Sequence, residues 1–190
     1  MNKIKKIGLI VEDNSDYESF RIIINRIVNN KKLSFAKFVG SGCGKIKRKA
    51  QAYCRILEKR GCDLLILVHD LDRNNYDELE RDLKSKFITL KPHFICIPKE
   101  EIEAWFLSDP DAIKKCLNLK RKPLIKGNPE NISSPKEYLL NQVKSCSNNE
   151  KIYLHTKHNE QLSREVSIDL IKNQCNSFEK FYNFICSQKF

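Results

Sequence analysis

Two aspartates separated by a single residue, Asp70 and Asp72, follow an unbroken apolar run at residues 64–68. A run this short is typical of a strand that is buried on both faces of a parallel sheet. Side chains two apart on an extended chain point the same way, so both carboxylates project from the carboxyl end of that strand. Open α/β sheets bind ligands at this edge. A cation would relieve the repulsion between the carboxylates, and hard oxygen donors suit Mg²⁺ or Mn²⁺.

The same residues also fit a simpler interpretation. Asp72 is followed by Arg73, Asn74 and Asn75, and such a segment is typical of a solvated turn that caps the next helix. An isolated pair of aspartates is weak evidence for a metal site. The metal interpretation therefore depends on what the other strands bring to the same edge.

The pattern around this run predicts an α/β fold. Three other short apolar segments are typical of strands, and the one at residues 33–39 alternates enough to favour a place near an edge. Either Ser15 or Asp16 is suited to cap the first helix. We therefore expect a parallel four-stranded sheet with helices on both faces. The remaining strands are expected at residues 5–11 and 94–98, and the helices after Asp16 and at 45–60, 76–87 and 100–107.

The character of the chain changes at Pro110. No strong strand pattern follows, and Ser134 with Pro135 is suited to start a helix. We expect residues 1–109 to form the α/β domain and residues 110–190 to form a helical extension packed on it as one structural unit. Helices are expected at residues 111–119, 135–143, 162–175 and 177–185, while residues 152–158 are left open.

Three of the predicted strands end in acids. Glu12 follows the first, Asp70 and Asp72 follow the third, and the fourth is followed by Glu100, Glu101 and Glu103. The carboxyl ends of parallel strands lie on one edge, so these side chains should converge. Such a cluster is best explained by a divalent cation that serves a phosphate ligand and activates water.

The charge balance favours an anionic partner. Among 190 residues, 35 are Lys or Arg against 24 Asp or Glu, a formal net charge of +11. Nucleic acid, a phosphorylated ligand or an acidic protein would each fit this excess. The candidate contacts with such a partner are Lys99 and a row of basic residues after the glycine-rich loop. The alternative interpretation of this row is a solvated helix face. This row consists of Lys45, Lys47, Arg48 and Lys49.

The loop at residues 40–45 is not a P-loop. Gly40 and Gly44 enclose three residues where that motif has four, and Ile46 stands where it has Ser or Thr. The loop could offer backbone N–H groups to a phosphate, or be a plain glycine-rich turn.

The eight cysteines do not form any Cys-x-x-Cys pair, which predicts reduced, mostly buried thiols in the cytoplasm. No apolar run approaches the length that spans a membrane. The strand pattern points His69 away from the aspartates, so we treat it as structural. His155 and His158 are interpreted as a surface pair.

Residues 11–16 and 69–72, with a glycine-bearing turn after the second strand, resemble the TOPRIM domain of topoisomerases, bacterial primases and OLD-type nucleases. Glu12 and Asp16 match the family pattern, whereas Asp13 stands where glycine is usual. The resemblance covers roughly residues 4–109. It implies a Rossmann-like fold, Mg²⁺ binding by Asp70 and Asp72, and a role for Glu12 as a further ligand or as general acid/base.

Residues 97–109, 134–137 and 175–178 are similar to a narrower group of small stand-alone bacterial TOPRIM proteins. This resemblance implies DNA or RNA and an ABC- or SMC-like ATPase as partners, and a role in defence against phage. It does not decide whether the protein forms a homo-oligomer. A second metal site would be completed by Glu101 or Glu103. Because residues two apart on a helix cannot share a face, we expect Glu103 to point inward, with Glu100 as its rival.

The leading hypothesis is therefore a Mg²⁺- or Mn²⁺-dependent nuclease. Two alternatives remain. Residues 9–14 resemble the acidic pair of a phospho-receiver domain, with Asp70 as the phosphorylated residue, although later receiver motifs are missing. The second alternative is a TOPRIM-like adaptor that binds nucleic acid or a protein partner without catalysis.

Overall fold

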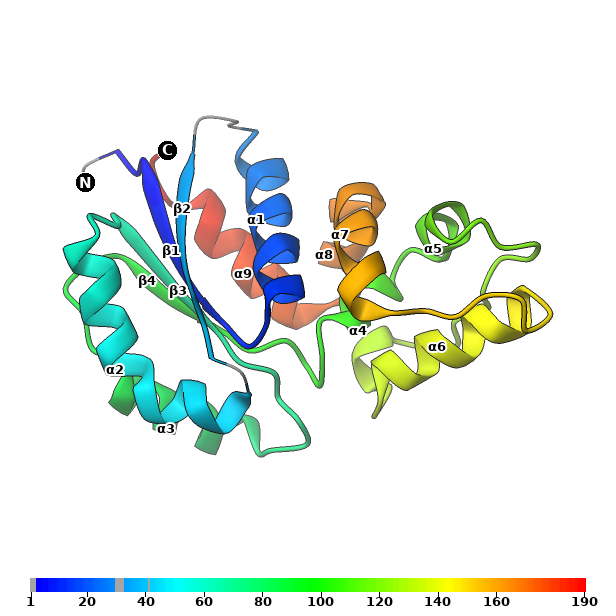
Figure 1. Cartoon of the computed structure of the whole chain (residues 1–190), viewed down its shortest axis with the longest axis horizontal. Helices are drawn as coiled ribbons and strands as arrows, with labels where there is room; N and C mark the ends of the chain where they lie inside the picture. Colours follow the sequence, from blue (N-terminus) through cyan, green and yellow to red (C-terminus); the bar gives the residue numbers. More distant parts are fainter. Residues whose placement is uncertain (1–2, 30–32, 41) are drawn as a thin grey trace.

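The computed structural model in Figure 1 describes residues 3–29, 33–40 and 42–190. Its centre is a four-stranded sheet in the order β2-β1-β3-β4, and every pair of neighbours is parallel. This confirms the predicted α/β class and the place of the second strand at an edge. The strands are β1 (Lys6–Val11), β2 (Ser34–Val39), β3 (Leu64–Val68) and β4 (His93–Cys96).

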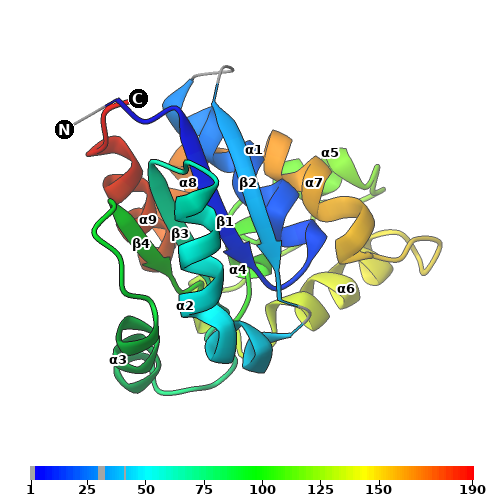
Figure 2. The same ribbon diagram turned by 60° about the vertical axis from the view of Figure 1, so that its left-hand side comes forward.

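Helices cover both faces of the sheet (Figure 2). One face packs on α2 (Cys43–Lys59) and α3 (Tyr76–Lys86), and the other packs on α1 (Asn14–Val28) and α9 (Asn176–Cys186). The central strand explains the layering, because successive side chains of β3 enter opposite cores. All five residues of β3 are buried, which is why its sequence is uniformly apolar.

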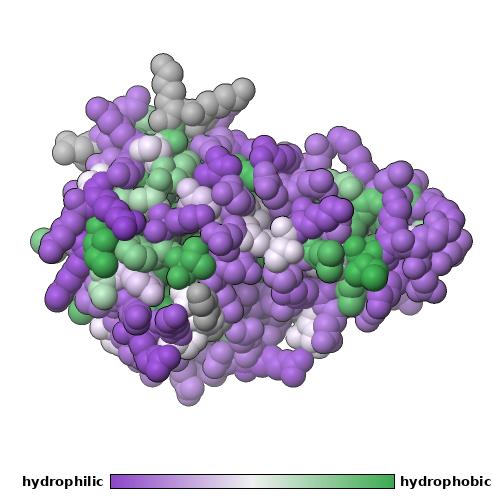
Figure 3. All heavy atoms as spheres, in the orientation of Figure 1, coloured by the Kyte–Doolittle hydropathy of each residue, from purple (hydrophilic) through white to green (hydrophobic). Residues whose placement is uncertain are grey.

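The helices between β4 and α9 gather beside the sheet, on the right of Figure 1, and we call them the helical lobe. Hydrophilic residues cover most of the face seen in Figure 3. The lobe comprises α4 (Glu103–Phe106), α5 (Pro110–Cys116), the short 3₁₀ helix η1 (Pro129–Asn131), α6 (Pro135–Cys146), α7 (His155–Glu165) and α8 (Ile168–Gln174).

The chain returns from the lobe to the sheet through α9. Phe94 of β4 stacks on Phe184 with ring centroids 4.7 Å apart, and Trp105 lies edge-on to Phe20 and Phe178. The Ile4 N–H donates to the Lys189 carbonyl oxygen at 2.8 Å, so the two ends of the described chain meet at the amino edge of the sheet. Sheet and lobe share one continuous hydrophobic core.

Several predicted boundaries were wrong for local reasons. The helix expected at residues 162–175 is broken, because Val166 is extended (ψ 139°) and Ser167 caps the new helix α8. The helix expected at residues 100–107 is helical only from Glu103, because Glu100 is left-handed (φ 61°). The N-cap of α1 is Asp13, two residues before Ser15 and three before Asp16.

The seven cysteines whose side chains the structure describes are free thiols, and most of them are buried. Cys54 and Cys96 lie in the core, while Cys116 is half-buried and Cys186 is exposed. In the described part of the chain, no helix is both long and apolar enough to cross a bilayer.

The buried carboxylate of Glu130 holds the start of α9. It accepts the Asn176 N–H at 2.9 Å and the Ser177 N–H at 3.0 Å, and its residue is 6% exposed. We expect Glu130→Gln to lower the free energy of unfolding by about 1–3 kcal/mol, because one acceptor oxygen and the charge at the helix start are lost. Urea unfolding monitored by circular dichroism measures the change.

Glu150→Gln is the matched control, because it removes a carboxylate from an exposed ion pair with Lys120. Its effect should stay within about 0.5 kcal/mol. Equal losses in the two variants would contradict the role given to Glu130.

Candidate functional site

Acids from three strand ends approach one another at the carboxyl edge of the sheet. Asp70 follows β3, Glu12 follows β1, and Glu103 opens α4 after β4. Asp70 lies within range of repulsion by Asp16, Glu103, Asp72 and Glu12, in decreasing order of strength. The parallel strand order thus brings together acids that are up to 91 positions apart, from Glu12 to Glu103.

Burial and repulsion act together on two of these acids. The pKa of Asp70 is raised well above its ordinary value, first because protein replaces water around the carboxyl and then because of the neighbouring carboxylates. Burial, with repulsion from Asp13, Glu103 and Glu12, raises the pKa of Asp16 to about 7. Two carboxyls with strongly raised pKa values at one sheet edge are typical of functional sites.

The start of α1 positions Asp16. The Asp16 N–H donates to Asp13 Oδ1 at 2.9 Å, and the Asp13 N–H donates back to Asp16 Oδ2 at 3.2 Å, which forms a capping box. The helical lobe contacts the same turn. Ser15 Oγ donates to the His155 carbonyl oxygen at 3.0 Å, and His155 Nε2 lies 3.5 Å from Asp13 Oδ2.

The loops after β3 and β4 lie side by side in an unusual backbone conformation. Asp72, Arg73 and Glu100 are left-handed, with φ of 47°, 60° and 61°. The Leu71 N–H donates to the Pro98 carbonyl oxygen at 3.1 Å, and the Arg73 N–H donates to Glu100 Oε2 at 2.9 Å. Left-handed residues other than glycine cost energy and concentrate at functional sites.

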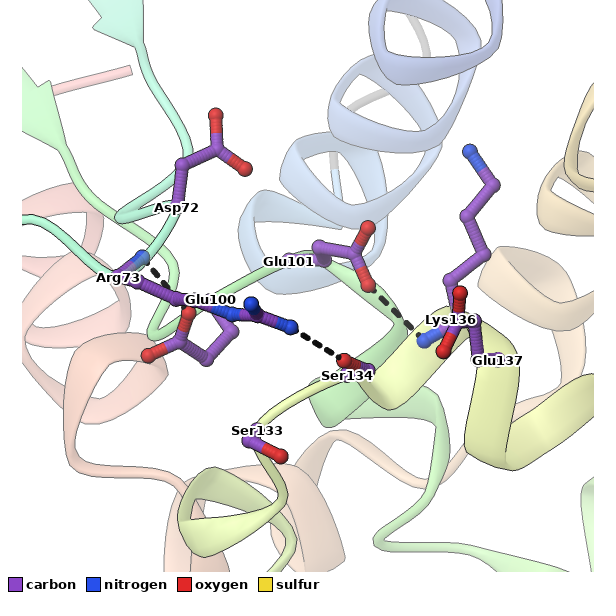
Figure 4. A pocket seen from close by; sticks show the side chains of 8 residues that line it. All are labelled: Asp72, Arg73, Glu100, Glu101, Ser133, Ser134, Lys136 and Glu137. Carbon is purple, nitrogen blue, oxygen red and sulfur yellow. Dashed lines mark hydrogen bonds between the residues drawn. The ribbon is translucent and has the colours of Figure 1, made fainter.

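The Glu100 carboxylate is occupied by this loop contact. Figure 4 shows it pointing away from the carboxylates of Asp72 and Glu101. The sequence left Glu100 as the rival to Glu103 for a place in the site. The Glu100 side chain instead accepts the Arg73 N–H.

Glu103 is buried and held by the helical lobe. Its residue is 3% exposed, and its Oε1 accepts hydrogen bonds from the Tyr153 hydroxyl at 2.8 Å and from Asn159 Nδ2 at 3.3 Å. The Tyr153 hydroxyl also contacts Asn159 Oδ1. This network fixes the carboxylate within range of Asp70 and Asp16.

Glu101 lies on the same side, contrary to the expectation that Glu101 and Glu103 exclude each other. That expectation assumed a helix, and Glu101 precedes the helix α4. Its Oε2 accepts the Lys136 N–H at 2.9 Å. Burial raises the pKa of Glu101, repulsion by Glu103 and Asp72 adds to the rise, and the Lys136 N–H and charge oppose it.

A pocket of about 310 Å³ opens beside these acids (Figure 4). Arg73 Nη2 crosses it to donate to Ser134 Oγ at 3.1 Å. The pocket therefore joins the loop after β3 to the first turn of α6. Its lining residues are Asp72, Arg73, Glu100, Glu101, Ser133, Ser134, Lys136 and Glu137.

The predicted basic row on α2 is partly engaged within the protein. Lys47 pairs with Asp82 of α3 at 2.8 Å, and Arg48 Nε donates to the Gly44 carbonyl oxygen at 3.2 Å. Lys45 and Lys49 are exposed. Ser41, in the glycine-rich loop before this row, lies outside the described residues.

The other predicted polar residues have these positions. Lys99 Nζ donates to Asn131 Oδ1 at 3.2 Å. His69 is buried beside the backbone, with Nδ1 2.7 Å from the Asp70 carbonyl oxygen. His158 Nδ1 accepts the Leu154 N–H at 2.9 Å, while His155 faces Asp13.

Sequence reasoning missed several residues of this site. Asp16 was considered as a helix cap and as part of a family pattern, but not as one of the site acids. Tyr153 and Asn159 lie about fifty residues beyond Glu103, in a segment with no clear pattern, so no local signal marks them. Among the described residues, no three His, Cys, Asp or Glu side chains are gathered closely enough to hold a metal ion as they stand.

The raised pKa of Asp16 predicts a pH dependence in metal-free protein. Its folded pKa of about 7 exceeds the ordinary 3.8, so the folded state binds more protons between these values and loses stability as pH rises through them. Asp16→Asn keeps a capping oxygen and removes the charge. Relative to wild type, its free energy of unfolding should rise by at least about 1 kcal/mol from pH 4 to pH 8.

Urea unfolding in chelator across this pH range makes the measurement. Asp77→Asn, at an exposed carboxylate on α3, is the control and should follow the wild-type curve. Parallel curves for Asp16→Asn and wild type would contradict the electrostatic description of the site.

No curated protein and no solved structure matches this chain. One family model does match, and it covers residues 11–185. The matched segment begins at the last residue of β1 and ends in the last turn of α9, so it contains every acid of the site. The chain belongs to the family described as domain of unknown function (DUF4276).

Proposed function

We propose that this protein is a Mg²⁺- or Mn²⁺-dependent phosphodiesterase of the TOPRIM type that cleaves DNA or RNA. One observation carries the proposal. The carboxyl of Asp70 lies among Asp16, Glu103, Asp72 and Glu12, and its burial, together with repulsion by these carboxylates, raises its pKa. A divalent cation is the ligand that such a set of hard oxygen donors would accept.

The surrounding charges support a cation at this edge. The chain has a formal net charge of +11. Yet within the described residues no Lys, Arg or His nitrogen forms an ion pair with Asp16, Asp70 or Glu103. Unpaired carboxylates in partial burial are costly, and a shared ion would draw them together and offset that cost.

Each acid has a distinct part in the proposal. Asp70 and Asp72 would hold the ion from the end of β3, and Glu12 would contribute a further oxygen from β1 or act as general acid/base toward the attacking water. Glu103, which accepts a hydrogen bond from Tyr153, would complete the oxygen set from α4. The bound ion would lower the pKa of an attacking water and stabilise charge on the phosphoryl oxygens.

The local backbone agrees with this assignment at the position where the sequence departs from TOPRIM proteins. Asp13 replaces the usual glycine, but its φ of −136° and ψ of −179° are extended, which any residue adopts. Asp13 also caps α1 and so orients the turn that carries Glu12 and Asp16. The replacement is therefore compatible with a working site.

The proposed biological setting rests on the resemblance to small stand-alone TOPRIM proteins. By that resemblance, the protein is an effector of defence against phage that acts with an ABC- or SMC-like ATPase. The basic composition supports nucleic acid as the substrate class.

Metal binding is tested first by thermal unfolding with and without millimolar Mg²⁺ or Mn²⁺. We expect the midpoint of wild type to rise by several degrees, because a ligand of the folded state stabilises it by mass action. Asp70→Asn and Asp72→Asn should abolish the shift, and Asp111→Asn, at an exposed carboxylate on α5, should preserve it.

Cleavage of labelled DNA and RNA, with and without the ATPase, is then measured on the same proteins. Loss of metal-dependent cleavage in Asp70→Asn, with cleavage retained in the control Asp111→Asn, supports the proposal. If Asp70→Asn cleaves as wild type does, the proposed site is wrong. Binding of nucleic acid without metal response or cleavage identifies the adaptor instead.

Tyr153 is expected to act as a positioning residue through Glu103. Tyr153→Phe removes one hydrogen bond to Glu103 Oε1 and leaves that from Asn159. Outer partners of metal ligands typically change affinity by about tenfold, so we expect the Mn²⁺ concentration at half-maximal thermal shift to rise about tenfold. Tyr182→Phe, on α9, is the control.

A structural effect of Tyr153→Phe would lower the metal-free midpoint without changing the metal titration. That pattern would contradict a positioning role for Tyr153.

A further inference from the structure

A second pocket, of about 470 Å³, lies in the helical lobe between α6 and the loop that precedes η1. We call it the α6 groove. Three of its lining side chains are cationic and none is acidic, in contrast to the pocket beside Asp72. It is lined by Arg121, Lys122, Leu124, Lys126, Tyr138, Gln142, Ser145 and Cys146.

The loop that carries the cations is fastened to α6. The Arg121 N–H donates to the Cys146 carbonyl oxygen at 3.2 Å, and Arg121 Nη2 donates to that of Ser145 at 2.7 Å. Further along, the Leu124 N–H donates to Gln142 Oε1 at 3.3 Å, and Tyr138 donates to the Leu124 carbonyl oxygen at 3.1 Å. The backbone of the loop and the Arg121 guanidinium are therefore held in place before any ligand arrives, and the exposed Lys122 and Lys126 extend from this fixed loop.

The same helix reaches the candidate metal site. The N-cap and first turn of α6 supply Ser134 and Lys136 to the pocket beside Asp72, and later residues of the helix supply Tyr138 and Gln142 to the α6 groove. The loop runs antiparallel to α6, so it leads from the far end of the helix toward the acids. With 12 residues, α6 is about 18 Å long, which spans about five phosphates of one B-form strand.

We propose that the α6 groove binds the phosphodiester backbone of the nucleic-acid strand whose scissile phosphate enters the acidic pocket. The position of the scissile phosphate rests on the proposed function. Carboxylates around Asp70 repel a polyanion when no cation is bound, so binding energy must come from cations elsewhere. Lys122 pairs with Asp111 across an exposed surface at 3.0 Å, a contact weak enough for phosphate to replace.

This assignment replaces the basic row of α2 as the main contact surface. Lys47 of that row pairs with Asp82 in a less exposed contact than that between Lys122 and Asp111. The row also lies on the opposite side of the sheet from the helical lobe. The α6 groove instead shares a helix with the pocket where Arg73 and Lys136 meet the acids.

The test is fluorescence anisotropy in chelator with a labelled single-stranded oligonucleotide, made as DNA and as RNA. Lys122→Gln/Lys126→Gln removes two positive charges from the groove. Lys5→Gln/Lys59→Gln removes two exposed charges at the amino edge of the sheet and is the matched control. Lys45→Gln/Lys49→Gln tests the α2 row.

We expect the groove variant to raise Kd about tenfold and to reduce the slope of log affinity against log salt by about 1.4, or about 0.7 for each lost phosphate contact. The control should change Kd less than about twofold. Three results would overturn the proposal: equal weakening in the groove variant and the control, a larger loss in the α2 variant than in the groove variant, or no binding of either oligonucleotide by wild type.

Chelator separates this test from that of the nuclease. Groove-dependent binding that persists in Asp70→Asn supports the groove whether or not cleavage is found. If Lys122→Gln/Lys126→Gln cleaves as wild type does at subsaturating substrate, the groove does not bind the substrate strand. The proposed function would be unaffected by that result.

Discussion

Repulsion between carboxylates that share the carboxyl edge of one parallel sheet is the constraint on which this structure depends. The order β2-β1-β3-β4 places the ends of β1, β3 and β4 next to one another, and each of these strands is followed by an acid. Partial burial of Asp70 and Asp16 makes their charges costlier still. Within the described part of the chain, neither carboxyl has an ion pair with a basic side chain, so a cation at this edge would offset the cost.

The helical lobe stabilises the acids without neutralising them. Tyr153 and Asn159 donate to Glu103, and the Lys136 N–H donates to Glu101, so these contacts to the two carboxylates come from uncharged donor groups. The lobe is held in turn by Glu130 at the start of α9 and by aromatic packing around Trp105. The acidic site is therefore a property of the whole chain rather than of the sheet alone.

The sequence predicted those parts of the molecule whose structure depends on local pattern. The apolar run at residues 64–68 identified β3, and the acids after three strands identified the edge of the sheet where they meet. Left-handed Glu100, which keeps Glu101 outside the helix, had no such signal because its conformation depends on the neighbouring Arg73 backbone. Tyr153 could not be found either, since only tertiary packing brings it to Glu103.

The most direct test of the metal site is a crystal of the protein soaked in Mn²⁺ and measured at a wavelength where manganese scatters anomalously. We expect an anomalous peak at the carboxyl edge of the sheet, in contact with Asp70 and with Asp72 or Glu12, that is absent from crystals of Asp70→Asn. A peak that persists in Asp70→Asn, or manganese bound only at surface carboxylates away from β3, would contradict it.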